Sequence, residues 1–214
     1  MTDKTLILSS CGALSVDQMA IDLICFNFCS QIGRLISDNV DFLASQNPFN
    51  PESKVLASAI DVYAGDLPAL GSCIVLRVAV NLPDVKRQIL DYAKEICEFS
   101  EPFKRVILLR SVPSVFGTDT QISDWPDVVR GFGSVTEVLK MKSIEDYDES
   151  QEMLKAAVFG EFFECLRRFM KVDFSAVLIF VHKAAVVSGA NALAAAVSGK
   201  SDLKAPPSWD TVFC

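Results

Sequence analysis

The residues most able to do chemistry are a serine–cysteine turn, one histidine and two carboxylates in apolar surroundings. The turn, Ser9-Ser10-Cys11-Gly12, stands between an apolar run and a helical pattern. Backbone N–H groups at such a helix start can bind a phosphate. The turn has one glycine and lacks both the G-x-G-x-x-G and the Gly-Lys-Ser/Thr patterns. A plain strand-to-helix connection is therefore favoured over a nucleotide site.

His182 is the only histidine, so a catalytic triad or a histidine-ligated metal would have to use it. It ends an apolar run, and ligands bind at the carboxyl ends of parallel strands. Asp22 and Asp61 lie among apolar residues, where burial can shift a carboxyl pKa. No G-x-S-x-G elbow accompanies them. The sequence thus predicts no catalytic residue and no cofactor, with a small-molecule hydrolase or phosphorylase as the alternative function.

The cysteines are odd in number and form no C-x-x-C motif: Cys11, Cys25, Cys29, Cys73, Cys97, Cys165 and Cys214. Cys25 and Cys29 are one helical turn apart, which could suit a metal. With one histidine and no second cysteine pair, no zinc site is expected. Four of the thiols lie in apolar segments, where they behave as small hydrophobes. Reduced, buried thiols of a cytosolic protein are the preferred interpretation.

The length and net charge of the chain exclude further classes of protein. The 214 residues suit one moderate domain, half of them are hydrophobic, and the net charge is −7. The acidic balance argues against a nucleic-acid or anionic-membrane partner. The apolar runs are far shorter than the ~20 residues of a membrane span, and the N-terminus lacks a signal-peptide pattern. An intracellular, water-soluble protein is expected.

A helix is predicted from Val16 to about Gln31, with Ser15 and Gln18 as a capping box and Gly33 as the stop. Apolar residues cover nearly its whole circumference, whereas a surface helix shows one stripe. One side must face the core, and the other needs a cover, either another element or a partner chain. We therefore consider a partner surface on this helix, formed by Met19, Leu23 and Phe26.

Strand and helix patterns alternate along the rest of the chain. Strands are predicted at 5–10, 34–37, 55–64, 72–80, 105–112, near 134–139 and at 176–183. Further helices are predicted from Asn81 to about 99, at 150–170 with a break at Gly160, and at 191–197. The central strands are unbroken apolar runs, which indicates burial on both faces. The prediction is a layered α/β/α sandwich with a mainly parallel, mixed sheet, in one domain of residues 1–205.

The final segment, residues 206–214, is predicted to be an extended tail. Pro206-Pro207 cannot continue a helix and favours an extended course. A terminal carboxylate beside an aromatic can be captured by backbone donors and a cation on a partner. The alternative is that Trp209 and Phe213 pack back on their own domain, as many termini do. Both remain open at this point.

The sequence resembles the proteasome assembly chaperone 2 family in segments that occur in the same order. In that family a Ser-Val turn leads to a Gln-Leu-Ala-x-Asp-Leu helix. An Ile-Gly step, an Asn-Pro-aromatic turn, two apolar strands and a Pro-Ser-Ser-Trp segment follow. The matching residues are Leu14–Ile24, Gln31–Gly33, Asn47–Phe49, Arg105–Leu109, Ala176–Val181 and Pro207–Trp209. The family's Gly-Asn-x-Gly insertion after the Ser-Val turn is absent here.

The resemblance implies a sandwich similar to phosphorylase/hydrolase-like folds, without their enzymatic activity. It implies an obligate partner, proteasome assembly chaperone 1, and a heterodimer on the outer face of the proteasome α-ring. The heterodimer would guide subunit order in the cytoplasm, with the nucleus as a second compartment. Val212, Phe213 and Cys214 would insert between α-subunits. The family signature has tyrosine at the position of Phe213, so docking would lack one hydrogen bond, worth ~1 kcal/mol.

Overall fold

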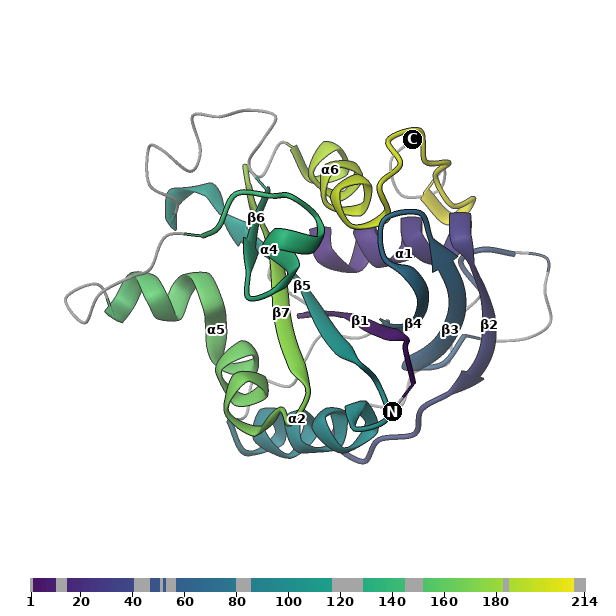
Figure 1. Cartoon of the computed structure of the whole chain (residues 1–214). Helices are drawn as coiled ribbons and strands as arrows, with labels where there is room; N and C mark the ends of the chain where they lie inside the picture. The colour runs from purple at the N-terminus through teal and green to yellow at the C-terminus, as the bar shows by residue number, and fades with distance from the viewer. Residues whose placement is uncertain are drawn as a thin grey trace.

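A seven-stranded sheet forms the centre of the computed structural model, with the strand order β2-β3-β4-β1-β5-β7-β6 (Figure 1). The model describes residues 2–10, 15–40, 47–50, 52, 57–79, 86–116, 129–144, 152–182 and 185–209. The centre of the sheet is parallel and consists of β4 (Gly71–Val78), β1 (Thr5–Ser9), β5 (Arg105–Pro113) and β7 (Asp173–Val181). On one side β2 (Cys29–Arg34) and β3 (Ile60–Leu67) add antiparallel strands, and on the other β6 (Val129–Phe132) does so. The predicted mixed sheet is confirmed.

Helices cover both faces of this sheet. One face carries α1 (Val16–Phe28) and α6 (Val186–Ser198), and the other carries α2 (Lys86–Ser100) and α5 (Glu152–Phe169). Two short helices, η1 (Ser114–Phe116) and α4 (Val135–Val138), lie near the β6 side. The predicted three-layer α/β/α arrangement is therefore confirmed. No helix in the described parts of the chain is both long and apolar enough to cross a membrane.

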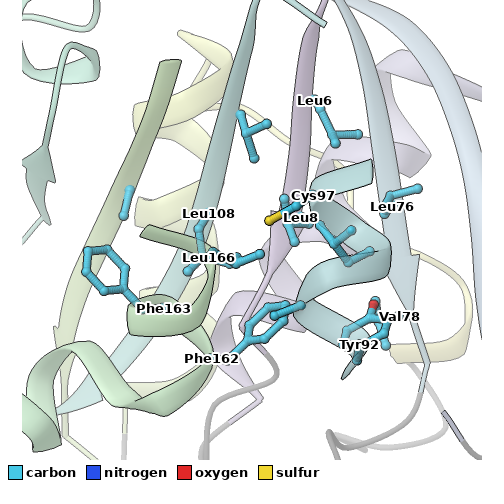
Figure 2. Packing of buried hydrophobic residues seen from close by; sticks show 14 of the residues in the cluster. Leu6, Leu8, Leu76, Val78, Tyr92, Cys97, Leu108, Phe162, Phe163 and Leu166 are labelled. Carbon is cyan, nitrogen blue, oxygen red and sulfur yellow. The ribbon is translucent and has the colours of Figure 1, made fainter. Parts of the chain in front are cut away.

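Successive side chains of a strand point to opposite faces of the sheet, so the buried residues form two core clusters, one on each face. Within β1, Leu6 and Leu8 belong to the cluster under α2 and α5, while Ile7 belongs to the cluster under α1 and α6. All five residues of β1 are buried, which is why the strand reads as a continuous apolar run. Figure 2 shows sheet residues facing helix residues in the first cluster: Leu6, Leu8, Leu76, Leu108, Tyr92, Phe162, Phe163 and Leu166.

The predicted first helix begins at Val16, as expected, but it ends earlier than predicted and lacks the predicted capping box. It stops at Phe28, and Cys29 begins β2 without an intervening turn, so Gly33 lies in a strand. Ser15 has a left-handed backbone with φ 54° and makes no capping hydrogen bond through its side chain. The capping box fails because Gln18 donates instead to the carbonyl of Val78, 3.4 Å away.

Other boundaries also shift. The strand predicted near 134–139 is the helix α4, and the strand of this region is β6, which pairs with β7. Gly133, with φ +78°, separates the two because its left-handed backbone ends the strand. The strand predicted at 55–64 is β3, which runs on to Leu67. The helix cap predicted at Asn81 lies outside the described residues.

Candidate partner-binding site

The C-terminal segment folds back onto the domain as far as Trp209. Pro206 and Trp209 are buried, and the backbone N–H of Trp209 donates to the Pro206 carbonyl at 3.0 Å. The Trp209 side chain is 8% exposed and belongs to the core cluster under α1 and α6. The extended course predicted from Pro206-Pro207 is therefore not adopted by residues 206–209. Residues 210–214, with Val212, Phe213 and Cys214, lie outside the described part of the chain.

Asn27, in the last turn of α1, anchors this segment. Its Oδ1 accepts a bond of 3.0 Å from the backbone N–H of Lys204, and its Nδ2 donates to the Lys204 carbonyl at 2.9 Å. The same Nδ2 donates to the Leu23 carbonyl within the helix, also at 2.9 Å. The asparagine thus holds both backbone groups of one residue, as a neighbouring strand would. In Figure 1 the yellow segment after α6 accordingly runs beside α1.

The Asn-Pro-Phe turn at 47–49 meets the same segment. Asn47 Oδ1 accepts from the N–H of Phe49 at 2.9 Å, which is the usual asparagine turn. The Pro48 carbonyl accepts from the N–H of Ser208 at 3.3 Å. The Phe49 ring lies 5.9 Å from that of Phe26 on α1, between ring centroids. Two segments that carry the family resemblance, 47–49 and 207–209, are therefore in contact.

The cover of α1 comes from the chain itself. Helix α6 packs on α1, and both contribute to one core cluster. Of the three residues predicted to form a partner surface, Leu23 is 1% exposed and points into that core. Met19 and Phe26 are half-buried. The alternative of another element as the cover is thus the one found, and Leu23 offers no surface to a partner in this state.

The two carboxylates singled out by the sequence lie on either side of Arg77, at the carboxyl end of β4. Arg77 Nε donates to Asp22 Oδ1 at 2.7 Å, and its NH1 lies 3.9 Å from Asp61 Oδ2. Asp61 also accepts from Gln31 and Ser58. Burial raises the pKa of Asp22 in spite of the adjacent guanidinium. Because each charge has an opposite neighbour, these three side chains link β3, β4 and α1 through ion pairs.

A second polar cluster occupies the carboxyl ends of β1 and β5. The fully buried Asp17 accepts from Ser10 Oγ at 2.8 Å and from Ser111 Oγ at 3.1 Å. Arg110 NH1 approaches Ser10 Oγ at 3.4 Å, and its Nε donates to the Val158 carbonyl. These groups satisfy one another where an α/β fold would bind a ligand.

Arg110 also accounts for the break in α5. Gly160 has φ 73° and ψ 164°, which interrupts the helix as predicted. Arg110 donates to the carbonyls of Ala157 and Val158, which precede the break. A cation is favourable at such a helix end because the last carbonyls lack helical partners. The φ of +73° favours glycine at this position, and a Cβ at Gly160 would lie 2.6 Å from Arg110 NH2, so the guanidinium would have to move.

His182 and the cysteines complete the predicted sites. His182 directly follows β7, whereas the sequence predicted it inside the strand 176–183, and it is exposed. Hydrogen bonding to Cys25, together with burial, raises the pKa of Cys29 to about 12. Burial raises the pKa of Cys97 to about 11. In the part of the chain that the structure describes, no group of three His, Cys, Asp or Glu side chains is placed to hold a metal ion.

Comparison with known proteins supplies structural relatives only. No family model matches the sequence, and no curated protein matches it. PbaA of Pyrococcus furiosus, described as an archaeal homolog of proteasome-assembly chaperone, superposes with a TM-score of 0.60. It is 14% identical, and the match covers 99% of this chain and 84% of that one. The chain has the fold of this protein.

Two further solved structures share the fold. A protein of unknown function from Thermoplasma acidophilum has a TM-score of 0.61 at 14% identity, covering 99% of this chain and 82% of its own. A PAC2 family protein from Streptomyces avermitilis MA has a TM-score of 0.52 at 12% identity, covering 95% and 88%. The fold expected from the sequence resemblance is therefore the fold observed.

Sequence reasoning missed the residues that join distant segments. Asn27, Arg77 and Arg110 were not singled out, although each bonds a group at least 47 positions away. Arg110 offered one usable signal, since an arginine inside the apolar run 105–112 must find buried acceptors. Asn27 offered none, because a polar residue near the end of a helix ordinarily faces water.

Proposed function

We propose that this protein is a non-enzymatic chaperone for assembly of the proteasome core particle. In this proposal it acts as a heterodimer with proteasome assembly chaperone 1 on the α-ring, in the cytoplasm and also in the nucleus. The supporting observation is a fold shared over nearly the whole chain with a protein described as a homolog of proteasome-assembly chaperone. The contact between the 47–49 turn and the 207–209 segment adds support, because it joins two parts of the sequence resemblance.

The proposed α-ring contact is a tail shorter than the sequence alone predicts. Since the chain is fixed up to Trp209, the part proposed to dock begins after this anchor. Val212, Phe213 and Cys214 enter a pocket between α-subunits, and the terminal carboxylate meets a lysine there. The anchor lowers the entropic cost of docking, because the base of the tail is already ordered.

The heterodimer contact is proposed to use the exposed parts of Met19 and Phe26. Leu23 is buried in the core cluster against which Met19 packs, so it contributes to this surface only through packing. Phe26 packs against Phe49, so the 47–49 turn belongs to the same area. Such a half-buried apolar surface suits a protein partner better than a small ligand.

The absence of catalysis is likewise proposed. It is supported by the mutual bonding of Ser10, Asp17 and Ser111, which leaves both oxygens of the Asp17 carboxylate engaged by hydroxyl donors. A general base must reach a substrate proton at about 2.6–3.2 Å. An Asp17 held in this way is better suited to fixing the start of α1 than to proton transfer.

The decisive experiment is affinity purification from the cells of origin through an N-terminal tag, which leaves the C-terminal carboxylate free. The proposal expects proteasome α-subunits and a second chaperone of the same assembly pathway in the eluate. A control bait truncated after Trp209 should retain the second chaperone and lose α-subunits. Recovery of neither from either bait would refute the proposal.

A further inference from the structure

Three cysteine side chains meet where β2 begins. Cys29, the first residue of β2, lies opposite Gly65 of β3, and Gly65 in turn lies opposite Cys73 of β4. Residues directly opposite each other in antiparallel strands point to the same face of a sheet. The two cysteines therefore flank a glycine on the face that carries α1. Cys25, in the last turn of α1, is one helical turn before Cys29, whose backbone N–H donates to the Cys25 carbonyl.

The glycine leaves the space in which two of the sulfur atoms meet. A Cβ at Gly65 would lie 2.8 Å from Cys29 Sγ, so this sulfur lies where the side chain of any other residue would begin. The Cys73 thiol donates a hydrogen bond to Cys29, and the Cys29 thiol donates one to Cys25. Cys25 and Cys73 are each 1% exposed, whereas Cys29 is half-buried. A solute therefore reaches the cluster through Cys29.

The spacing of the strands excludes a disulfide between Cys29 and Cys73. Neighbouring strands lie about 4.8 Å apart, so Cα atoms on two strands with a third between them are about 9.6 Å apart. A disulfide requires Cα atoms within about 7 Å of each other. A metal ion at about 2.3 Å from each of two thiolates holds the sulfurs up to about 4.6 Å apart. An inserted ion thus spans a gap that a sulfur–sulfur bond cannot.

The number and kind of ligands restrict which ion fits. Zinc takes four ligands in a structural site. Among the residues that the structure describes, no three His, Cys, Asp or Glu side chains are placed to hold one metal ion. Soft thiolate ligands favour Cu(I), a d10 ion for which two thiolates in line suffice. The thiols also lie in the core cluster under α1 and α6, away from the water that a hard cation keeps.

We propose that Cys29 and Cys73 bind one soft d10 cation between them, with Cu(I) as the physiological example. The ion replaces the two thiol protons and links the edge strand β2 to β4 across Gly65. Cys25 keeps its proton and donates a hydrogen bond to the Cys29 sulfur, which favours the thiolate form of that ligand. The proposal does not depend on the proposed chaperone function.

The affinity should depend steeply on pH, because both ligands are protonated thiols before the ion binds. Hydrogen bonding to Cys25, together with burial, raises the pKa of Cys29 to about 12. Hydrogen bonding to Cys29, together with burial, raises the pKa of Cys73 as well. Since two protons are displaced, the apparent affinity should rise about 100-fold for each unit of pH up to pH 10. Ordinary surface thiols, with a pKa of about 8.5, would lose this dependence above about pH 9.

The test is a titration of the reduced, full-length protein with Cu(I), without oxygen and in competition with a chromophoric Cu(I) chelator. Cys29→Ala and Cys73→Ala should each weaken the tightest site at least ~100-fold, because one of its two ligands is lost. The matched control is Cys97→Ala, which removes a thiol of the other core cluster, 8% exposed, and should leave that site unchanged. Urea denaturation of each variant shows that it is folded.

Hydrogen exchange on the parent supplies a readout that needs no variant. With Cu(I) bound, backbone amides of β2 should exchange at least ~10-fold more slowly, because the ion links this edge strand to β4. Amides of β6, at the opposite edge of the sheet, should not change. Equal Cu(I) affinity in the parent, Cys29→Ala and Cys73→Ala overturns the proposal. So does a loss of the site in Cys97→Ala, unchanged exchange in β2, or a Cys29–Cys73 disulfide formed on mild oxidation.

Discussion

Replacing Asn27 with alanine should release the C-terminal segment without unfolding the domain. The substitution removes two hydrogen bonds to the backbone of Lys204, each worth about 0.5–1.5 kcal/mol. It also replaces asparagine by a better helix former, which returns about 0.6 kcal/mol. We expect the free energy of unfolding to fall by about 0.5–2.5 kcal/mol, measured by urea denaturation.

Asn191→Ala is the matched control. Asn191 Nδ2 bonds the carbonyl four residues earlier, that of Val187, at 2.9 Å, as Asn27 Nδ2 bonds Leu23. Within the described residues the Asn191 side chain makes no hydrogen bond to a distant segment, so this change isolates the effect within the helix. Asn191→Ala should therefore be neutral or slightly stabilising.

The Lys204 amide gives the sharpest readout, because its N–H donates directly to Asn27 Oδ1. Hydrogen exchange at this amide should accelerate at least ~5-fold in Asn27→Ala, corresponding to about 1 kcal/mol of lost local stability. Exchange in the strands β1 and β5 should stay slow. Equal exchange at Lys204 in the parent and the variant would refute the anchor.

Two further predictions concern the core. Gly160→Ala should lower the free energy of unfolding by about 1–3 kcal/mol, because φ 73° disfavours a side chain and its Cβ would meet Arg110. Gly33→Ala, whose Cβ meets nothing within 4 Å, should change that free energy by less than about 0.5 kcal/mol in the same denaturation assay; similar losses in both variants would contradict the role given to the kink. Cys97, whose pKa burial raises from 9.0 to about 11, should be alkylated about 100-fold more slowly at pH 8 than in the urea-unfolded chain, as followed by peptide mass spectrometry. The sign for stability follows from the same pKa: between pH 9 and 11 the unfolded state loses the thiol proton that the folded state keeps, so the Cys97 contribution makes stability fall as pH rises through this window. Equal native and unfolded alkylation rates would show that Cys97 is not sheltered.

The parts of the fold that were predictable are those set by burial. The strands β1, β5 and β7 are covered on both faces, so their sequences are continuous apolar runs. Helix α2 shows a single apolar face because only one side packs on the sheet. The break at Gly160 could be predicted because glycine destabilises a helix interior and readily adopts the left-handed backbone that ends a helix.

The errors arose where a distant contact outweighed a local preference. Ser15 and Gln18 have the spacing of a capping box, but the Gln18 amide bonds the end of β4 instead. The Pro206-Pro207 pair restricts the backbone locally, and burial of the Trp209 indole decides where the chain goes. Asn27 acts on Lys204, 177 positions away, and no local pattern records such a pair.

Only part of the candidate site could therefore be predicted from the sequence. The over-apolar helix α1 correctly indicated a need for cover, and the cover is α6. The partner surface inferred from its residues included Leu23, because periodicity does not distinguish two buried sides of one helix. Asp22 and Asp61 were noted separately, and only the structure reveals Arg77 between them.

The most direct test of the account is the affinity of the purified protein for assembled proteasome α-rings, with and without residues 212–214. The account predicts that the deletion weakens binding at least ~10-fold, while the free energy of unfolding stays unchanged because the buried Trp209 is retained. Phe213→Tyr should bind up to about fivefold more tightly, through one added hydrogen bond of ~1 kcal/mol. Undiminished affinity of the deletion variant for the ring would contradict the central claim.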